Sequence, residues 1–357
     1  MTTLTAATAA TVQLKAKRLP KYAPWAIAAA AVLIGLGGVT FAAGGGPVVG
    51  AILAALIYFV ALITIATFVE GGRSARNRAA SALIGSAFVL AVLPLLSVAF
   101  TTISRGADRF DADFFYRSMN GITALNAGGG AYHAILGTLE QVGIAVLITV
   151  PLGLAGAIYV VEYGRGRLAK WIQFFVDVMT GIPSIVAGLF VLAFWVMVIS
   201  PIFNDGRPAY SGFAAALALS VLMLPTIVRS AEEMLRLVPS ALREGSYALG
   251  VPKWRTILKV VIPTALPGIV TGVMLAVARA AGETAPVMLV AGGAFAINGN
   301  PFAGQQTSLS LYIYDQASTA SQYAPARAWT AALTLVAIVL LLTIVAKLVA
   351  RRSKLTR

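Results

Sequence analysis

Eight long apolar stretches leave this chain few possible folds. A transmembrane helix needs about 20 consecutive, mostly apolar residues. Of the 357 residues, 59% are hydrophobic and 11% are charged, whereas a soluble domain carries about 25% charged residues. Lipid must therefore be the solvent for much of the chain, and we predict an all-α polytopic membrane protein. The predicted spans are residues 25–43, 47–69, 82–103, 134–161, 172–200, 212–228, 264–293 and 329–350.

Prolines inside the longest stretches indicate interrupted helices. Pro151, Pro183 and Pro286 all lie within predicted spans, and each removes a backbone N–H from the helical ladder. Membrane helices tolerate such breaks where the freed carbonyls line a cavity or find partners. Thr180 and Ser184 add hydroxyl groups beside Pro183, so we expect a break there that lines a polar cavity. A packing kink against small residues is the alternative.

The basic residues predict the orientation. With the N-terminus inside, 21 of the 27 Lys and Arg residues fall on cytoplasmic segments and five on outer segments. Basic residues accumulate on cytoplasmic loops of membrane proteins, so both termini are expected in the cytoplasm. Residues 25–43 could instead be a signal peptide, because Thr40-Phe41-Ala42-Ala43 resembles a cleavage region. That apolar run is longer than a usual signal sequence, and a second span follows it closely.

Composition also excludes several kinds of chemistry. The chain has no Cys and a single His, which excludes disulfides, thiol nucleophiles and multi-His metal sites. The net charge of +14 is scattered among apolar runs, so membrane lipid, and not nucleic acid, is the expected partner of the basic residues. No Gly-x4-Gly-Lys-Ser/Thr phosphate loop is present, so the chain is not expected to bind ATP by that device. We therefore predict no catalytic residues, cofactor or metal on this chain.

The cytoplasmic loop 229–263 has a helical pattern. Residues 240–248 are expected to form a short helix with its first residue as the N-cap, and Gly250 suits a left-handed C-terminal cap. Pro252 suits the first turn of a second helix, and Pro263 is expected to close the segment before the next span. Two short helices at right angles would form a knob on the cytoplasmic face, suited to docking.

The spacing within this loop resembles a known family. Glu244-Gly245-Ser246, three residues, Gly250, nine residues, then Val260-x-Ile262-Pro263 is similar to the EAA loop of bacterial ABC importer permeases. The resemblance implies that this loop sits in a cleft of an ATPase subunit and transmits its closure to the spans. The alternative is an ordinary amphipathic linker with a solvated Glu244. The implied coupling residues are Glu244, Gly245, Ser246, Gly250 and Pro263.

Two further segments are similar to phosphate permeases. Gly181-Ile-Pro-Ser-Ile185 resembles one of their segments, and residues 278–284 resemble their Ala-Arg-Ala-x-Gly-Glu-Thr motif. The following Ala285-Pro286 and the triplet Glu162-Tyr163-Gly164 are typical of PstA-type subunits. The resemblance implies a type I ABC importer permease with a six-helix core. It implies a permease domain at 82–350, with its core at 134–350 and its coupling loop at 229–263. The N-terminal pair of spans lies outside this plan, so residues 1–70 are expected to form a cytoplasmic N-terminus and an accessory two-helix hairpin.

The same resemblance implies partner subunits. These are a PstC-like permease sibling, a PstB-like ATPase dimer that carries ATP and Mg²⁺, and a PstS-like phosphate-binding protein. The expected location is the bacterial plasma membrane.

Ionisable residues inside predicted spans are candidates for the translocation pathway. Arg279 and Glu283 are four residues apart and would share a helix face. Either charge alone would be costly in lipid, so we expect the two to pair and face the bundle interior, where Arg279 suits an oxyanion. A purely structural ion pair is the alternative. The candidate pathway residues are Arg279, Glu283, Asp177, Thr180, Pro183 and Ser184.

Two rival functions remain open. The first is an ABC importer permease for another oxyanion, such as molybdate, sulfate or phosphonate. The second is a self-contained membrane enzyme or ion-coupled transporter, which would need a catalytic or ion site of its own.

Overall fold

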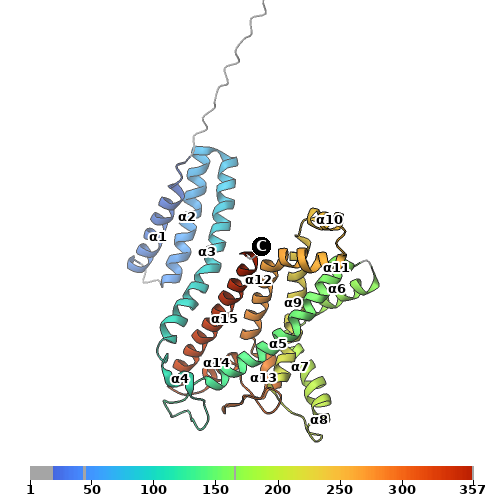
Figure 1. Ribbon diagram of the computed structural model, residues 1–357. Helices are drawn as coiled ribbons and strands as arrows, with labels where there is room; N and C mark the ends of the chain where they lie inside the picture. Colours follow the sequence, from blue (N-terminus) through green and yellow to red (C-terminus); the bar gives the residue numbers. More distant parts are fainter. Residues whose placement is uncertain (1–18, 43–45, 165, 356–357) are drawn as a thin grey trace, which may run out of the picture. The chain divides into compact units, whose positions relative to one another are not determined.

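The computed structural model describes residues 19–42, 46–164 and 166–355, and these are mostly helical (Figure 1). Within the described residues there is no β-strand, and an isolated parallel bridge joins Gly292 to Gln306. The chain divides into two compact units, residues 1–99 and 100–357, with the boundary inside one long helix. The all-α polytopic fold predicted from the sequence is confirmed.

The first unit is a helical hairpin followed by the first part of a long helix. Gly35 and Ala54 let the two hairpin helices approach closely, because a Cβ on Gly35 would lie 2.6 Å from the Ala54 Cβ. Where the second helix meets the third, Glu70 pairs with Arg78 at 2.6 Å and accepts the N–H of Leu19. The helices are α1 (Ala23–Ala42), α2 (Pro47–Glu70) and α3 (Gly72–Gly106).

The second unit is a bundle around α9 (Gly212–Arg236), the most buried span, with 67% of its most apolar window inside the protein. Its core is built from small and aliphatic residues such as Ala215, Leu219 and Ile227. The other spans are α5 with η1 (Tyr132–Ile158, Tyr159–Tyr163), α7 with η2 and α8 (Ser184–Val191, Leu192–Ile199, Ser200–Phe203), α11 with η3 and α12 (Lys253–Thr256, Ile257–Val261, Ile262–Gly282), and α15 (Ala324–Leu355).

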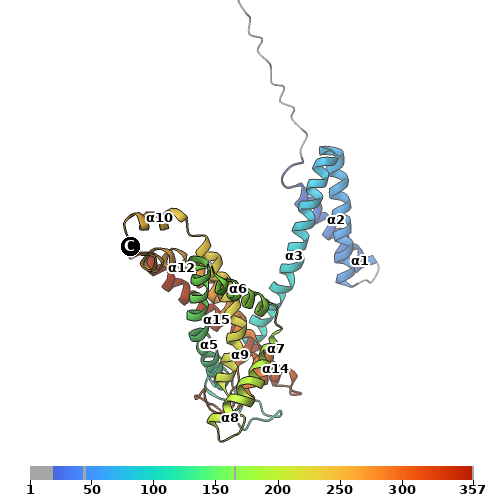
Figure 2. The same ribbon diagram turned by 90° about the vertical axis from the view of Figure 1, so that its right-hand side faces the viewer.

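Shorter helices lie at the two ends of this bundle. In Figures 1 and 2, α10 and the last turns of α15 lie at one end, and α8 and α14 lie at the opposite end. The short helices are α4 (Ala112–Tyr116), α6 (Arg167–Thr180), α10 (Ser240–Ala248), α13 (Ala285–Ala291) and α14 (Leu309–Ser318).

The described helices reproduce the predicted spans with two corrections. Seven helices are long and apolar enough to cross a membrane, and α1 supplies a shorter apolar helix over 23–38; the last residue of its predicted span lies outside the described residues. The predicted span 172–200 is wrong in extent, because the helix stops at Thr180 and restarts at Ser184. Pro183 disfavours a helical residue before it, so α6 is a separate amphipathic helix.

The predicted span 264–293 is also interrupted. Its helix begins earlier and ends at Gly282, since Glu283 has an extended backbone with ψ 124°. Pro286 lies in the first turn of a new helix, α13, a position that a proline favours. Pro183 and Pro286 therefore mark the start of an element, whereas the interruption expected at Pro151 is absent, because Pro151 lies inside the continuous helix α5.

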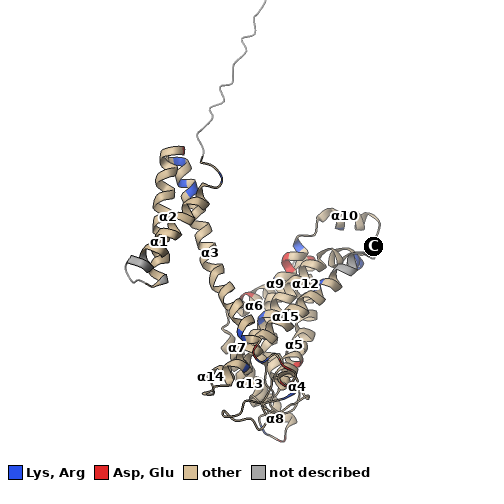
Figure 3. Cartoon of the chain, turned by 90° about the vertical axis from the view of Figure 1, so that its left-hand side faces the viewer, with Lys and Arg blue, Asp and Glu red and all other residues tan. Residues whose placement is uncertain are grey.

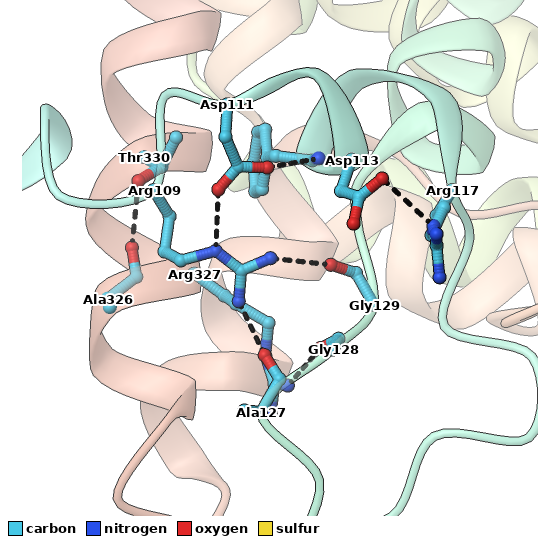
Figure 4. Close-up of polar contacts among 11 residues, drawn as sticks. Arg109, Asp111, Asp113, Arg117, Ala127, Gly128, Gly129, Ala326, Arg327 and Thr330 are labelled. Atoms are coloured by element: carbon cyan, nitrogen blue, oxygen red, sulfur yellow. Dashed lines mark hydrogen bonds and ion pairs between the residues drawn. The ribbon is translucent and has the colours of Figure 1, made fainter.

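Two arginines hold the loop that follows α4 in place (Figure 4). The side chain of Arg327 is 1% exposed and donates hydrogen bonds to Gln316 Oε1 at 2.7 Å and to the carbonyls of Gly128 at 2.8 Å and Asn126 at 3.2 Å. Arg109 donates to the carbonyls of Ala127 and Gly129. The carbonyls of residues 126–129 thus accept hydrogen bonds from two arginine side chains.

An Arg327→Met variant is expected to lose stability. The substitution leaves the buried Gln316 Oε1 without its donor and removes the donor from two loop carbonyls, and an unsatisfied buried group costs about 1–3 kcal/mol. Thermal unfolding in detergent should therefore show a clear fall in the midpoint. The matched control is Arg117→Met, which removes an exposed pair with Asp113 whose side chains are 66% and 62% exposed. Equal shifts for the two variants would contradict the role given to Arg327.

Candidate functional site

The predicted coupling segment forms a protruding helix at one end of the bundle (Figure 2). The helix expected at residues 240–248 is present as α10. Pro239, and not Ser240, is its N-cap residue, and no side chain bonds to the helix end there. Gly250 has φ +75°, as predicted for a left-handed cap. The turn that redirects the chain after α10 therefore depends on a glycine.

The motif residues of α10 are divided between a face that packs internally and a face that is exposed. The Ser246 hydroxyl lies 2.8 Å from the Thr256 hydroxyl and joins α10 to α11. Glu244 and Gly245 are exposed, and a Cβ on Gly245 would meet nothing within 4 Å. The carboxylate of the motif is therefore presented away from its own chain.

An apolar hollow of about 560 Å³ lies beside this exposed face. Leu242, Leu249 and Val251 are among its lining residues, with Arg255 and Lys259 as its cationic members. An exposed carboxylate and an apolar hollow bordered by cations form a surface that another protein could cover.

Two expectations about the loop 229–263 are wrong. The α9 helix continues to Arg236, and α11 begins at Lys253, so the non-spanning part is shorter than predicted. Pro263 does not close the segment, because α11, η3 and α12 form one continuous helix from Lys253 to Gly282. The π-helical segment η3 (Ile257–Val261) ends two residues before Pro263, and such a local change in hydrogen bonding accommodates a proline. The second half of the predicted coupling segment is thus the start of the spanning helix.

Arg279 and Glu283 form the expected ion pair, with Arg279 Nε 3.5 Å from Glu283 Oε1. They do not share a helix face, because Glu283 lies just past the end of α12. In the isolated chain the Arg279 side chain is 59% exposed and that of Glu283 is 18% exposed. A guanidinium facing lipid is costly, so water or another protein must cover Arg279.

Asp177, Thr180, Pro183 and Ser184 surround the break between α6 and α7. The Thr180 hydroxyl donates to the Val176 carbonyl at 2.7 Å, within its own helix. Pro183 is the N-cap residue of α7 and Ser184 is its first residue. The predicted break is confirmed. Its role as a cavity lining remains a prediction.

Asp177 belongs to a charge network between α6 and α9. It pairs with Arg229, which also pairs with the buried Glu232 at 3.0 Å. Arg236 and Gln173 donate to the other oxygen of Glu232, and Figure 3 shows charged residues gathered at the end of α9 near α10. Among the described residues, no hydrogen bond or ion pair joins this network to Arg279 or Glu283. The structure thus separates the predicted pathway residues into two groups.

Sequence reasoning missed Glu162 as a contact of the coupling segment. Its side chain pairs with Arg243 of α10 at 2.8 Å, although the two residues are 81 positions apart. The sequence feature that pointed to Glu162 was the triplet Glu162-Tyr163-Gly164, which lies at the end of a predicted span.

Comparisons with known proteins identify the family to which the chain is similar. Residues 149–355 match the family described as binding-protein-dependent transport system inner membrane component. The chain is 44% identical over 278 residues to the phosphate transport system permease protein PstA 1 of Mycobacterium tuberculosis, covering 78% of this chain and 89% of that protein. It is 34% identical over 293 residues to PstA of Yersinia pestis, covering 80% and 93%. An inward-facing structure of the MetNI methionine ABC transporter aligns with 63% of this chain and 94% of its own chain, at 22% identity and a TM-score of 0.49.

Proposed function

Because this chain belongs to the family of binding-protein-dependent transport inner membrane components, and within it to the PstA phosphate transport permeases, we propose that it forms part of the phosphate pathway of an ATP-driven importer. It is a membrane-embedded transport subunit and not an enzyme. ATP hydrolysis takes place on a separate subunit, which in this proposal carries the ATP and Mg²⁺.

The observation that carries this proposal is the exposed motif on α10. Glu244 and Gly245 face away from the chain, and Ser246 fixes α10 to the start of the helix that continues as α12. A push on α10 is therefore delivered to a membrane span. In this proposal a PstB-like ATPase dimer covers the motif and the adjoining hollow.

Arg279 is the proposed contact for phosphate within the membrane. A guanidinium offers several N–H donors in a fixed plane, which matches the oxygens of an oxyanion. Glu283 accepts a hydrogen bond from Arg279. In this proposal its negative charge keeps Arg279 from binding phosphate too tightly. A PstC-like permease is the proposed neighbour that completes the pathway and covers Arg279.

The basic residues support an orientation with both termini in the cytoplasm of a bacterial cell. This orientation places α10 in the cytoplasm with the ATPase and places α4 and α14 outside, where a PstS-like protein would deliver phosphate. Residues 1–70 are proposed as a cytoplasmic N-terminus and an accessory two-helix hairpin.

Uptake of labelled phosphate by the reconstituted complex tests this function. We expect ATP-dependent phosphate uptake that a tenfold excess of unlabelled phosphate suppresses, whereas equal excesses of sulfate and molybdate have little effect. Preferential competition by sulfate or molybdate would favour the permease for another oxyanion. Uptake by the purified chain alone would overturn the coupling proposal and favour a self-contained transporter.

A further inference from the structure

A buried ion pair joins the coupling helix to the end of a different span. Arg243 of α10 places Nε 3.0 Å and a terminal nitrogen 2.8 Å from the same oxygen of Glu162. The Glu162 side chain is 5% exposed and that of Arg243 is 17% exposed. Two nitrogens of one guanidinium on a shielded carboxylate form a strong, directional contact. The proposed docking of an ATPase on α10 does not itself require this contact.

The same two residues bring further elements together. Arg243 also donates to the carbonyls of Val238 at 2.7 Å and Leu235 at 2.9 Å, where α9 ends. Lys253, the first residue of α11, donates to the Glu162 carbonyl, and its Nζ lies 4.6 Å from the centre of the Tyr163 ring. The last turn of the α5 span is therefore held by α10 and by the start of α11.

The end of this span has a fixed geometry. It finishes in the π-helical turn Tyr159–Tyr163, and Gly164 follows directly. A Cβ on Gly164 would lie 2.0 Å from the Val160 carbonyl oxygen, so any other residue would displace the turn. Glu162 is thus held on a short, well-defined end and not on a free loop.

The α5 helix connects this contact to the opposite end of the bundle. Midway, a Cβ on Gly153 would lie 2.7 Å from Ile227, so α5 packs closely on α9. Near its other end, Thr138 accepts the N–H of Leu309 at 2.7 Å, and a Cβ on Gly137 would lie 2.2 Å from the Thr307 carbonyl. A displacement of the Glu162 end would therefore reach the segment 307–309 through one continuous helix, Tyr132–Tyr163.

We propose that Glu162 is a positioning residue through which α10 moves α5 and, with it, the segment at the opposite end of the bundle. The ion pair with Arg243 is the link, and Lys253 holds the adjacent backbone. This inference rests on the proposed function, because it requires an ATPase that moves α10. It adds a second route into the membrane beside the direct one through α11 and α12.

The test compares phosphate uptake with ATP hydrolysis in the complete complex reconstituted in vesicles. For Glu162→Gln we expect uptake per ATP to fall about tenfold while ATP hydrolysis changes less than about twofold, because the loss of one close contact is worth a factor of this order. The matched control is Lys170→Gln, which removes an exposed charge from α6 near the same end. The control should retain normal uptake per ATP.

A covalent replacement of the ion pair tests the mechanical role directly. The chain has no cysteine, so Glu162→Cys combined with Arg243→Cys introduces one pair of thiols. We expect a short bismaleimide to restore uptake per ATP in the double variant and to have no such effect on either single variant. The complex without introduced cysteines, treated in the same way, controls for thiols on partner subunits.

Three results would overturn the inference: normal uptake per ATP in Glu162→Gln, no recovery after confirmed cross-linking, or loss of the ATPase subunit from the variant complex. The last result would mean that the ion pair shapes the docking surface and does not transmit motion. Failure of the proposed function is distinguishable, because the unmodified complex would then show no ATP-dependent phosphate uptake.

Discussion

Arg279→Gln is expected to abolish phosphate uptake while the complex still assembles. The substitution keeps much of the side-chain length but removes the charge and the planar set of N–H donors that an oxyanion needs. Hydrogen bonds to charged groups contribute about 1.5–3 kcal/mol each, so loss of two reduces transport about 100-fold or more. Labelled phosphate uptake in vesicles, with subunit composition measured on the same sample, gives the result.

Two further variants separate chemistry from packing. Arg279→Lys keeps the positive charge but loses the planar set of N–H donors, so an intermediate uptake rate is expected. Arg117→Gln removes an arginine from a pair with the same four-residue spacing, Arg117 with Asp113, on an exposed surface, and should leave uptake unchanged. Normal uptake by Arg279→Gln would refute the pathway role, and loss of assembly would favour a structural ion pair.

Gly250→Pro is expected to uncouple ATP hydrolysis from transport while the protein still inserts into the membrane. Gly250 has φ +75°, whereas the proline ring fixes φ near −65°. The substitution must change the turn between α10 and α11, and with it the direction in which Glu244 is presented. Insertion depends on the apolar spans, which are unchanged. Uptake is therefore expected to fall to background, with ATP hydrolysis no longer accompanied by phosphate movement.

The matched control for this variant lies in the same motif. Gly245→Ala restores the residue found in the EAA pattern, and its Cβ would meet nothing within 4 Å. Near-normal uptake is expected for Gly245→Ala. Full phosphate transport by Gly250→Pro would show that α10 is not the element on which the ATPase acts.

Local sequence features predicted local structure well. The left-handed Gly250 follows from a capping rule that acts over a few residues. The helix at 240–248 was also predicted correctly, although the expected Ser240 cap does not form. The break at Pro183 follows from the missing N–H of proline. The prediction that a helix ends at Pro263 is wrong, because a π-helical segment lies before this proline and the helix continues through it. Whether a proline ends a helix depends on such adjustments in the neighbouring turns, which the pattern of residues does not reveal.

The apolar runs and charge distribution by themselves determined that this chain is a bundle of membrane helices, because the free energy of placing each stretch in lipid depends mainly on its composition. The motif spacing likewise located α10, the proposed coupling helix. Only the tertiary structure decided which charges meet: Asp177 with Arg229, Glu162 with Arg243, and Arg327 with the carbonyls of a loop about 200 positions away. Such contacts depend on how spans pack against one another, and packing brings together residues whose separation in sequence carries no information about their distance in space.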